Sequence, residues 1–242
     1  MILIALSVLN GAASAYQVYQ ADRHIASDTV DYFFLMGVGN AFYHTSILLS
    51  ALSMFIGALA IAEEKANGSL SVLNAKPIYK RDVFVGKFVG LSGFLLLLTT
   101  VIIMLIVSTL MIFYRGPFSA EELFLRMTSY IIITFLSCVL TLGIAMLIGI
   151  WLKKLLAILI VIGTFLCIDW FYTIPNALQS LNVFVPSSLL FTMLAENGTN
   201  LINTASGFQE WLNGALPYII FNIVEIVLIV LVSSHIISKM ET

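Results

Sequence analysis

Six long apolar stretches dominate the sequence and leave little choice of fold. A helix that crosses a membrane requires about 20 mostly apolar residues, and six segments meet or approach that length. They cover residues 2–19, 40–62, 89–114, 127–152, 155–174 and 217–237. Only 10% of the residues are charged, against about 25% in soluble domains, so there is too little polar surface to cover a water-soluble globule. The sequence therefore predicts an all-α membrane protein with six transmembrane helices in a single domain, 1–242.

Positive charge is distributed unequally between the two sides of this six-helix arrangement. All seven lysines and Arg81 fall on one side, whereas Arg23, Arg115 and Arg126 fall on the other. Lysine and arginine are enriched on the cytoplasmic side of membrane proteins, which places both termini in the cytoplasm. The lipid bilayer is then a partner, and the formal net charge of -2 gives no reason to expect a nucleic-acid partner.

The cytoplasmic connection between the second and third spans, residues 63–82, interrupts the apolar pattern with charge, glycine and proline. A short helix over residues 69–75 fits this segment, because Ser69 is a suitable N-cap and because Leu70 and Leu73 share one helical face. Such a helix would lie across the membrane surface and present an apolar knob to a groove on a soluble partner. The alternative is a simple polar connection between two spans.

Cap and turn signals predict the remaining short elements. Asp82 favours the first turn of the helix that becomes the third span. Between the fifth and sixth spans, a short helix is expected within 183–199, started by Pro186 and Ser187 and stopped by Gly198. A second short helix is expected over 206–213, and both would lie at the outer surface. Pro217 is then expected to open the sixth span as a first-turn proline.

The stretch AIAEEKANGSLSVLNAKPIYKRDVFVGKFVG, residues 60–90, resembles the signature of ABC-2 type exporter permeases. That signature runs alanine, an acidic pair, glycine, serine or threonine, two spaced leucines, proline, basic residues and a late Gly-Lys. Its positions here are Ala62, Glu63, Glu64, Gly68, Ser69, Leu70, Leu73, Pro77, Lys80, Arg81, Gly86 and Lys87. The segment VFVPSSLLFTML, residues 183–194, is similar to the family's Pro-Ser segment after the fifth span. The chain also resembles the small six-span permeases of this family that are associated with nitrous-oxide-reductase maturation and with multidrug, lipid or peptide export.

The resemblance implies a type V exporter-like fold and a role in ATP-driven export from a prokaryotic cell, across its plasma membrane. Two permease subunits, expected to be identical, would form a dimer, and each would insert the coupling helix over 69–75 into an ABC ATP-binding subunit, present in two copies. ATP and magnesium would be bound by that partner, so this chain is expected to hold no cofactor and to have no enzymatic activity. The residues implied in ATPase coupling are Glu63, Glu64, Gly68, Ser69, Leu70, Leu73, Pro77, Lys80 and Arg81.

The sequence around Gly86 and Lys87 agrees with this division between two chains. A phosphate-binding loop needs a glycine five residues before its Gly-Lys pair and a serine or threonine directly after it. Arg81 and Phe88 occupy those two positions here. ATP hydrolysis is therefore expected in another chain.

Three polar side chains inside predicted spans are candidates for a translocation path. Asp169 lies in the fifth span and Glu225 in the sixth, and Asn222 precedes Glu225 by one helical turn on the same face. An ionisable residue in a membrane costs at least ~2.5 kcal/mol and therefore faces the bundle interior or a cavity. The three side chains are candidates to line the path of a cargo molecule. The alternative is hydrogen bonding between helices, or interfacial solvation for Asp169.

Other classes of function stay open at this point. An ion- or proton-coupled secondary transporter or channel would use Glu225 and Asp169. An ABC-type mechanotransmitter would act on an outer-side partner and pass no substrate through itself. An intramembrane serine protease would need Ser92, in the sequence GLSG, and a base such as His235. No catalytic or metal site is expected, and the acidic residues of loop 22–31 are expected to be solvated.

Overall fold

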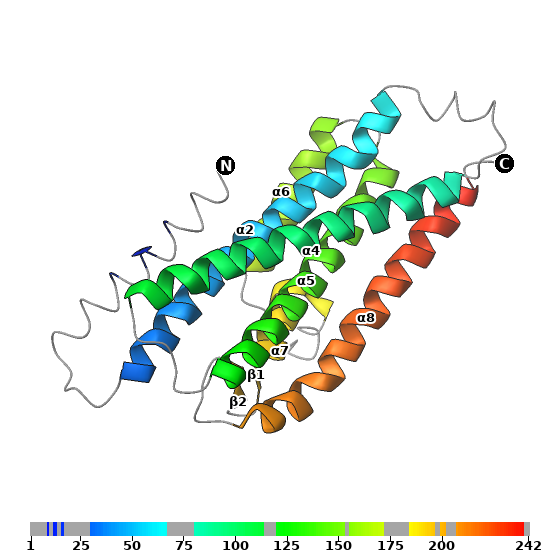
Figure 1. The fold of residues 1–242 in the computed structure, drawn as a ribbon. Coiled ribbons are helices and arrows are strands. Elements are labelled where there is room, and N and C mark those ends of the chain that lie inside the picture. The colour runs from blue at the N-terminus through cyan, green and yellow to red at the C-terminus, as the bar shows by residue number, and fades with distance from the viewer. Residues whose placement is uncertain are drawn as a thin grey trace.

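The computed structural model describes the chain over residues 30–66, 80–113, 120–152, 155–171, 184–196, 199–201 and 207–239, and four single residues before them. The described part folds into helices, with one short pair of strands (Figure 1). The helices are α2 (Val30–Ala66), α4 (Lys80–Phe113), α5 (Ala120–Trp151), α6 (Leu155–Phe171), α7 (Pro186–Leu194) and α8 (Phe208–Lys239). The strands are β1 (Ala195–Glu196) and β2 (Thr199–Asn200), which pair antiparallel.

Four of these helices are long and apolar enough to cross a membrane. The spanning candidates are Ala41–Ala62, Arg81–Thr109, Ala120–Trp151 and Phe208–Lys239, and a shorter apolar helix covers Leu156–Trp170. They correspond to the predicted spans two to six, so the prediction of a helical membrane protein is confirmed. Most of the predicted first span, 2–19, lies outside the described residues, and the total of six spans therefore stays a prediction.

The long helices alternate in direction. The end of α2, the start of α4, the end of α5, the start of α6 and the end of α8 all lie at one end of the bundle (Figure 1). We call this the inner end, because the sequence predicts it to be cytoplasmic. The short helix α7 and the two strands lie at the opposite, outer end (Figure 1). α2, α5 and α8 thus run in one direction, and α4 and α6 in the other.

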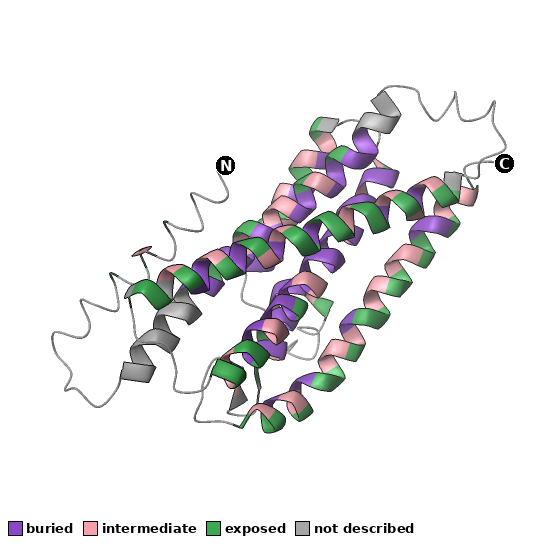
Figure 2. Ribbon diagram, in the orientation of Figure 1, coloured by how far each residue is buried: buried purple, intermediate pink, exposed green. Residues whose placement is uncertain are grey.

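α5 is the central helix of the bundle. It contacts α2, α4, α6, α7 and α8, and most of its residues between Arg126 and Ile150 are buried (Figure 2). α8, in contrast, is mostly exposed or half-buried. Its few buried residues are widely spaced: Trp211, Ala215, Asn222, Ser233 and Ser234. The exposed faces of α4 and α8 carry large apolar side chains such as Leu97 and Leu228, as lipid contact requires.

α2 and α5 approach each other closely. A Cβ atom at Gly57 would lie 2.9 Å from the carbonyl oxygen of Leu142 and 3.1 Å from the Cβ of Ala145. One turn further on, a Cβ atom at Gly149 of α5 would lie 3.1 Å from the Cβ of Ile61 of α2. Small residues allow this close approach between membrane helices, where dispersion forces and hydrogen bonds replace the hydrophobic effect.

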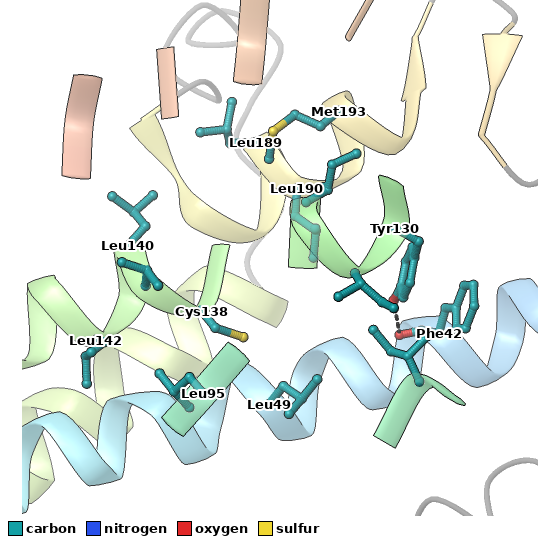
Figure 3. Close-up of a cluster of buried hydrophobic side chains, with 14 of the residues drawn as sticks. Phe42, Leu49, Leu95, Tyr130, Cys138, Leu140, Leu142, Leu189, Leu190 and Met193 are labelled. Carbon is teal, nitrogen blue, oxygen red and sulfur yellow. Dashed lines mark hydrogen bonds between the residues drawn. The ribbon is translucent and has the colours of Figure 1, made fainter. Parts of the chain in front are cut away.

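Polar contacts follow the same α2–α5 interface toward the outer end. The hydroxyl groups of Ser53 and Thr141 are 2.5 Å apart, and those of Ser46 and Tyr130 are 2.9 Å apart. The Tyr130 hydroxyl also donates to the carbonyl of Phe42 at 3.3 Å, and the two rings stack (Figure 3). Each hydroxyl is thereby satisfied inside the bundle, where lipid offers no partner.

The outer connection between α6 and α8 differs from the sequence-based expectation. Residues 208–213 are helical, as expected, but they do not form a separate short helix. The expected helix start at Pro217 is wrong, because α8 runs without interruption from Phe208 and holds Pro217 inside. The physical reason is the anchoring of its first turns: Trp211 is buried and its indole Nε1 donates to the carbonyl of Met193 at 3.0 Å.

The short helix before the strands is predicted correctly at its start and wrongly at its end. α7 begins at Pro186, as expected, but it ends at Leu194 and not near residue 199. The chain there turns back as β1 and β2, and the N–H of Leu201 donates to the carbonyl of Leu194 at 2.9 Å. α4 begins at Lys80 with Asp82 in its first turn, as the charge pattern predicts.

The close approach at Gly57 gives a stability test with a matched control. Gly57→Ala forces a methyl group against the Leu142 carbonyl, and overpacking of this kind costs about 1–3 kcal/mol. At Gly93, nothing lies within 4 Å of the Cβ position, and alanine there stabilises a helix by about 0.5–1 kcal/mol. Unfolding in detergent micelles is expected to show a lower midpoint for the first variant and an equal or higher one for the second. Equal midpoints would contradict the packing described here.

Candidate functional site

The predicted ATPase-coupling residues fall mostly outside the described part of the chain. Gly68, Ser69, Leu70, Leu73 and Pro77 lie in residues 67–79, which are not described. The flanking acidic and basic positions are placed by their backbones. Glu63 and Glu64 belong to the last turn of α2, and Lys80 and Arg81 begin α4. Both of these helix ends lie at the inner end of the bundle (Figure 1). Because most of the coupling residues lie outside the described part of the chain, their coupling role stays a prediction.

Asp169 has a structural contact that the sequence did not reveal. It is buried near the end of α6, and its Oδ1 accepts a hydrogen bond from the backbone N–H of Ser187 at 3.0 Å. The hydroxyl of Ser187 donates in return to the carbonyl of Asp169 at 2.6 Å. The N-cap residue of α7, Val185, has no side-chain cap of its own. Asp169 therefore caps the start of α7 from another helix, which favours the hydrogen-bonding alternative over a role in lining a path.

Arg126 is a second buried anchor at the outer end. It lies in α5 with an exposed fraction of 2%, and its guanidinium holds the Glu122 carboxylate at 2.6 and 3.0 Å. The same guanidinium donates to the carbonyl of Leu201 at 2.6 Å, directly after β2. The spacing of Glu122 and Arg126 indicates an ion pair on one helical turn, but nothing in the sequence indicates the carbonyl acceptor.

α7, β1 and β2 together form what we call the outer cap. Three buried hydrogen-bonding side chains fasten it to three different helices: Arg126 of α5, Asp169 of α6 and Trp211 of α8. Aromatic contacts add a fourth link, because Phe191 of α7 packs on Tyr43 of α2 and Trp170 of α6, with ring centroids 5.7 and 5.8 Å apart. The outer cap is therefore coupled to most of the bundle.

Asn222 and Glu225 lie together near the middle of α8, and neither takes part in the contact that Asp169 makes with α7. Asn222 is fully buried, and neither its Oδ1 nor its Nδ2 has a hydrogen-bond partner among the described residues. The Oε2 of Glu225 is shielded from solvent and is equally without a partner in that part of the chain. Ile229 continues this face one turn on and lies against Gly143 of α5.

A model of the family "ABC-2 family transporter protein" matches residues 5–233. The chain belongs to the ABC-2 transporter family. The match covers nearly the whole chain, so the resemblance found at residues 60–90 is confirmed. No curated protein matches the chain.

Membership of the ABC-2 transporter family makes this chain the membrane component of an ABC transporter. Such components are transport subunits that generally do not catalyse a reaction themselves, and they work in general with a separate ATP-binding subunit. Together with its apolar helices, this identifies a membrane-embedded permease subunit.

The protease alternative receives no support from the described side chains. The Ser92 hydroxyl donates to the carbonyl of Phe88 at 2.8 Å, one turn earlier in α4, which is the ordinary hydrogen bond of a helical serine. Within the described part of the chain, no three His, Cys, Asp or Glu side chains are grouped so that they could hold a metal ion.

The role of Asp169 is testable by hydrogen exchange in α7. Asp169→Ala removes the cap, which is worth about 1–2 kcal/mol, so the α7 amides are expected to exchange about 5–30-fold faster. Asp169→Asn keeps an acceptor oxygen and is expected to have a smaller effect. Glu210→Ala removes an exposed carboxylate at the start of α8 and serves as the control. Unchanged exchange in Asp169→Ala, with reduced transport, would instead support a path-lining role.

Proposed function

We propose that this chain is the membrane-spanning permease subunit of an ATP-driven exporter. It works as a dimer of two such subunits with two ABC ATP-binding subunits, in the plasma membrane of a prokaryotic cell and with both termini in the cytoplasm. The observation that supports this proposal most directly is the family match over residues 5–233. The coupling signature at residues 60–90 adds a specific point of contact with the ATP-binding subunit.

The helices that flank the coupling segment are joined to each other at the inner end. The ammonium group of Lys87, in α4, donates to the carbonyl of Ala60, in α2, at 2.5 Å. Arg81, six residues before Lys87 in the same helix, is exposed. A force applied to residues 69–75 therefore acts on both helices together and does not merely separate them.

α2 passes such a force into the centre of the bundle. At Gly57, against Leu142, and at Gly149, against Ile61, there is no room for a methyl group between α2 and α5, and close-packed interiors transmit displacement. α5 in turn contacts α7 and α8. In this proposal, closure of the ATP-binding subunits moves α2 and α5 as one unit and shifts them against α8.

The outer cap favours a second candidate function, that of a mechanotransmitter. Arg126, Asp169 and Trp211 tie the cap to three helices by buried hydrogen bonds. Movement of α5 would therefore reach the outer surface even without a cargo. In that case the cap itself would act on an outer-side partner, and no substrate would pass through the bundle.

The coupling role is tested by placing a charge on the apolar face of the predicted coupling helix. Leu70→Asp is expected to remove most of the ATPase stimulation that the permease gives to its reconstituted ATP-binding subunit, because a carboxylate cannot enter an apolar groove unpaired. Ser71→Asp adds the same charge one residue along, off the face shared by Leu70 and Leu73, and is the matched control. Membrane insertion is expected to be unchanged in both variants. Full stimulation by Leu70→Asp would rule out docking through this segment.

A further inference from the structure

The face of α8 that turns toward the bundle carries polar groups without partners. Asn222 is 0% exposed, and both atoms of its amide lack a hydrogen-bond partner in the described chain. Two more atoms on this face lack a hydrogen-bond partner in the described chain. They are the Oε2 of Glu225, one turn on, and the hydroxyl oxygen of Ser233, further along the helix. Buried polar groups in proteins are nearly always hydrogen-bonded, so this face calls for an explanation.

The cost of this arrangement argues against a purely structural role. Leaving a buried donor or acceptor without a partner costs about 1–3 kcal/mol. At the α2–α5 interface, Ser46 pairs with Tyr130 and Ser53 with Thr141, although the hydroxyls of Ser50 and Thr134 in these two helices also lack a partner among the described residues. Asn222 makes no such pair, so hydrogen bonding between helices does not account for it in this conformation.

Among the side chains that the structure describes, no lysine or arginine forms an ion pair with the Glu225 carboxylate. Arg126 binds Glu122, and Lys87 donates to the carbonyl of Ala60. Lys239, at the end of α8, is 14 residues away from Glu225, or about 21 Å along the helix. Within the described chain, Glu225 therefore lies in an apolar stretch with an acceptor oxygen and no positive partner.

A second copy of the chain would not supply the missing cation. In a symmetric dimer the same patch of both subunits takes part, and α8 carries no lysine or arginine before Lys239, so contact of α8 with α8 would add no positive partner near Glu225. The apolar side chains that border Glu225 on α8, Val224 and Leu228, are exposed. The surroundings thus suit a molecule that combines a positive group with an apolar body.

We propose that Asn222 and Glu225 form a binding site for the ammonium group of an apolar amine. The ammonium has three donors and no acceptor: the Glu225 carboxylate would accept one hydrogen bond and supply the opposite charge, and the Asn222 Oδ1 would accept another. The hydrocarbon part would lie along Val224 and Leu228. In the described conformation Asn222 is fully buried, so a ligand reaches it when α8 moves away from α5. This inference rests on the proposed export function and specifies its class of cargo.

The test is binding of dodecylammonium to the purified full chain in phosphatidylglycerol nanodiscs, with dodecanol as the uncharged match and empty nanodiscs subtracted. The wild-type chain is expected to bind the amine saturably and at least tenfold more tightly than the alcohol. Glu225→Gln keeps the shape and removes the charge, and it is expected to weaken amine binding at least tenfold while leaving alcohol binding unchanged. Asn222→Leu is expected to weaken it severalfold.

Two further variants keep this test decisive. Glu225→Asp retains the charge and is expected to retain most of the amine binding, which excludes misfolding as the cause of a loss in Glu225→Gln. Glu210→Gln, at an exposed carboxylate of the same helix, is expected to bind like the wild type. Equal affinity for amine and alcohol, or equal amine binding by Glu225→Gln and wild type, would overturn the proposal. A change in oligomeric state alone would assign these residues to a subunit contact and would also overturn it.

The source of the amine is distinguished by adding phosphatidylethanolamine to the nanodiscs. Competition by this lipid would identify a lipid ammonium as the ligand, and its absence would point to a separate amphiphilic amine. The chain alone samples the open position of α8 as a minor state, which the amine selects, so binding does not require the ATP-binding subunit and the two proposals fail separately. Amine binding without ATPase coupling would contradict the exporter function alone, and coupling without amine binding would contradict this site alone.

Discussion

The close contact between α2 and α5 is the constraint on which the rest of the structure depends. In lipid there is no hydrophobic drive to hold helices together, so shape and hydrogen bonds must do it. Gly57 brings the two backbones close enough for Ser46 to reach Tyr130 and for Ser53 to reach Thr141. This places α5 at the centre, where it contacts every other described helix. The result is a firm two-helix unit surrounded by more lightly packed helices.

This unit connects the two ends of the molecule that bear on function. At the inner end, α2 leads into the segment that carries the ABC-2 signature, and Lys87 ties α4 to it. At the outer end, Arg126 of α5 holds the chain that leaves β2. α8 contacts α5 more extensively than any helix except α2 does, but it buries few of its own residues, and in the proposed mechanism it is the helix that shifts against the unit. Its unsatisfied Asn222 marks the surface that such a shift would uncover.

The sequence predicts the helices well and the contacts between them poorly. Apolar length locates spans two to six, and Asp82 and Pro186 mark helix starts because caps and prolines act locally. The prediction that the sixth span begins at Pro217 is wrong because the buried Trp211, which donates to the Met193 carbonyl, holds the earlier turns of α8 in place. The Asp169–Ser187 and Arg126–Leu201 contacts depend on how helices are placed in space, and no local pattern encodes that. The coupling residues at 68–77 rest on the family signature and lie outside the described chain.

The most direct test of the central claim is a pair of spin-label distances in the reconstituted complex with its ATP-binding subunit. One pair joins exposed positions of α2 and α5, Phe55 and Ile132, and the other joins Ile132 to the exposed Leu228 of α8. Double electron–electron resonance without nucleotide and with trapped ATP is expected to show an unchanged α2–α5 distance and a changed α5–α8 distance. A shift between α2 and α5, with α5 and α8 fixed, would contradict the account.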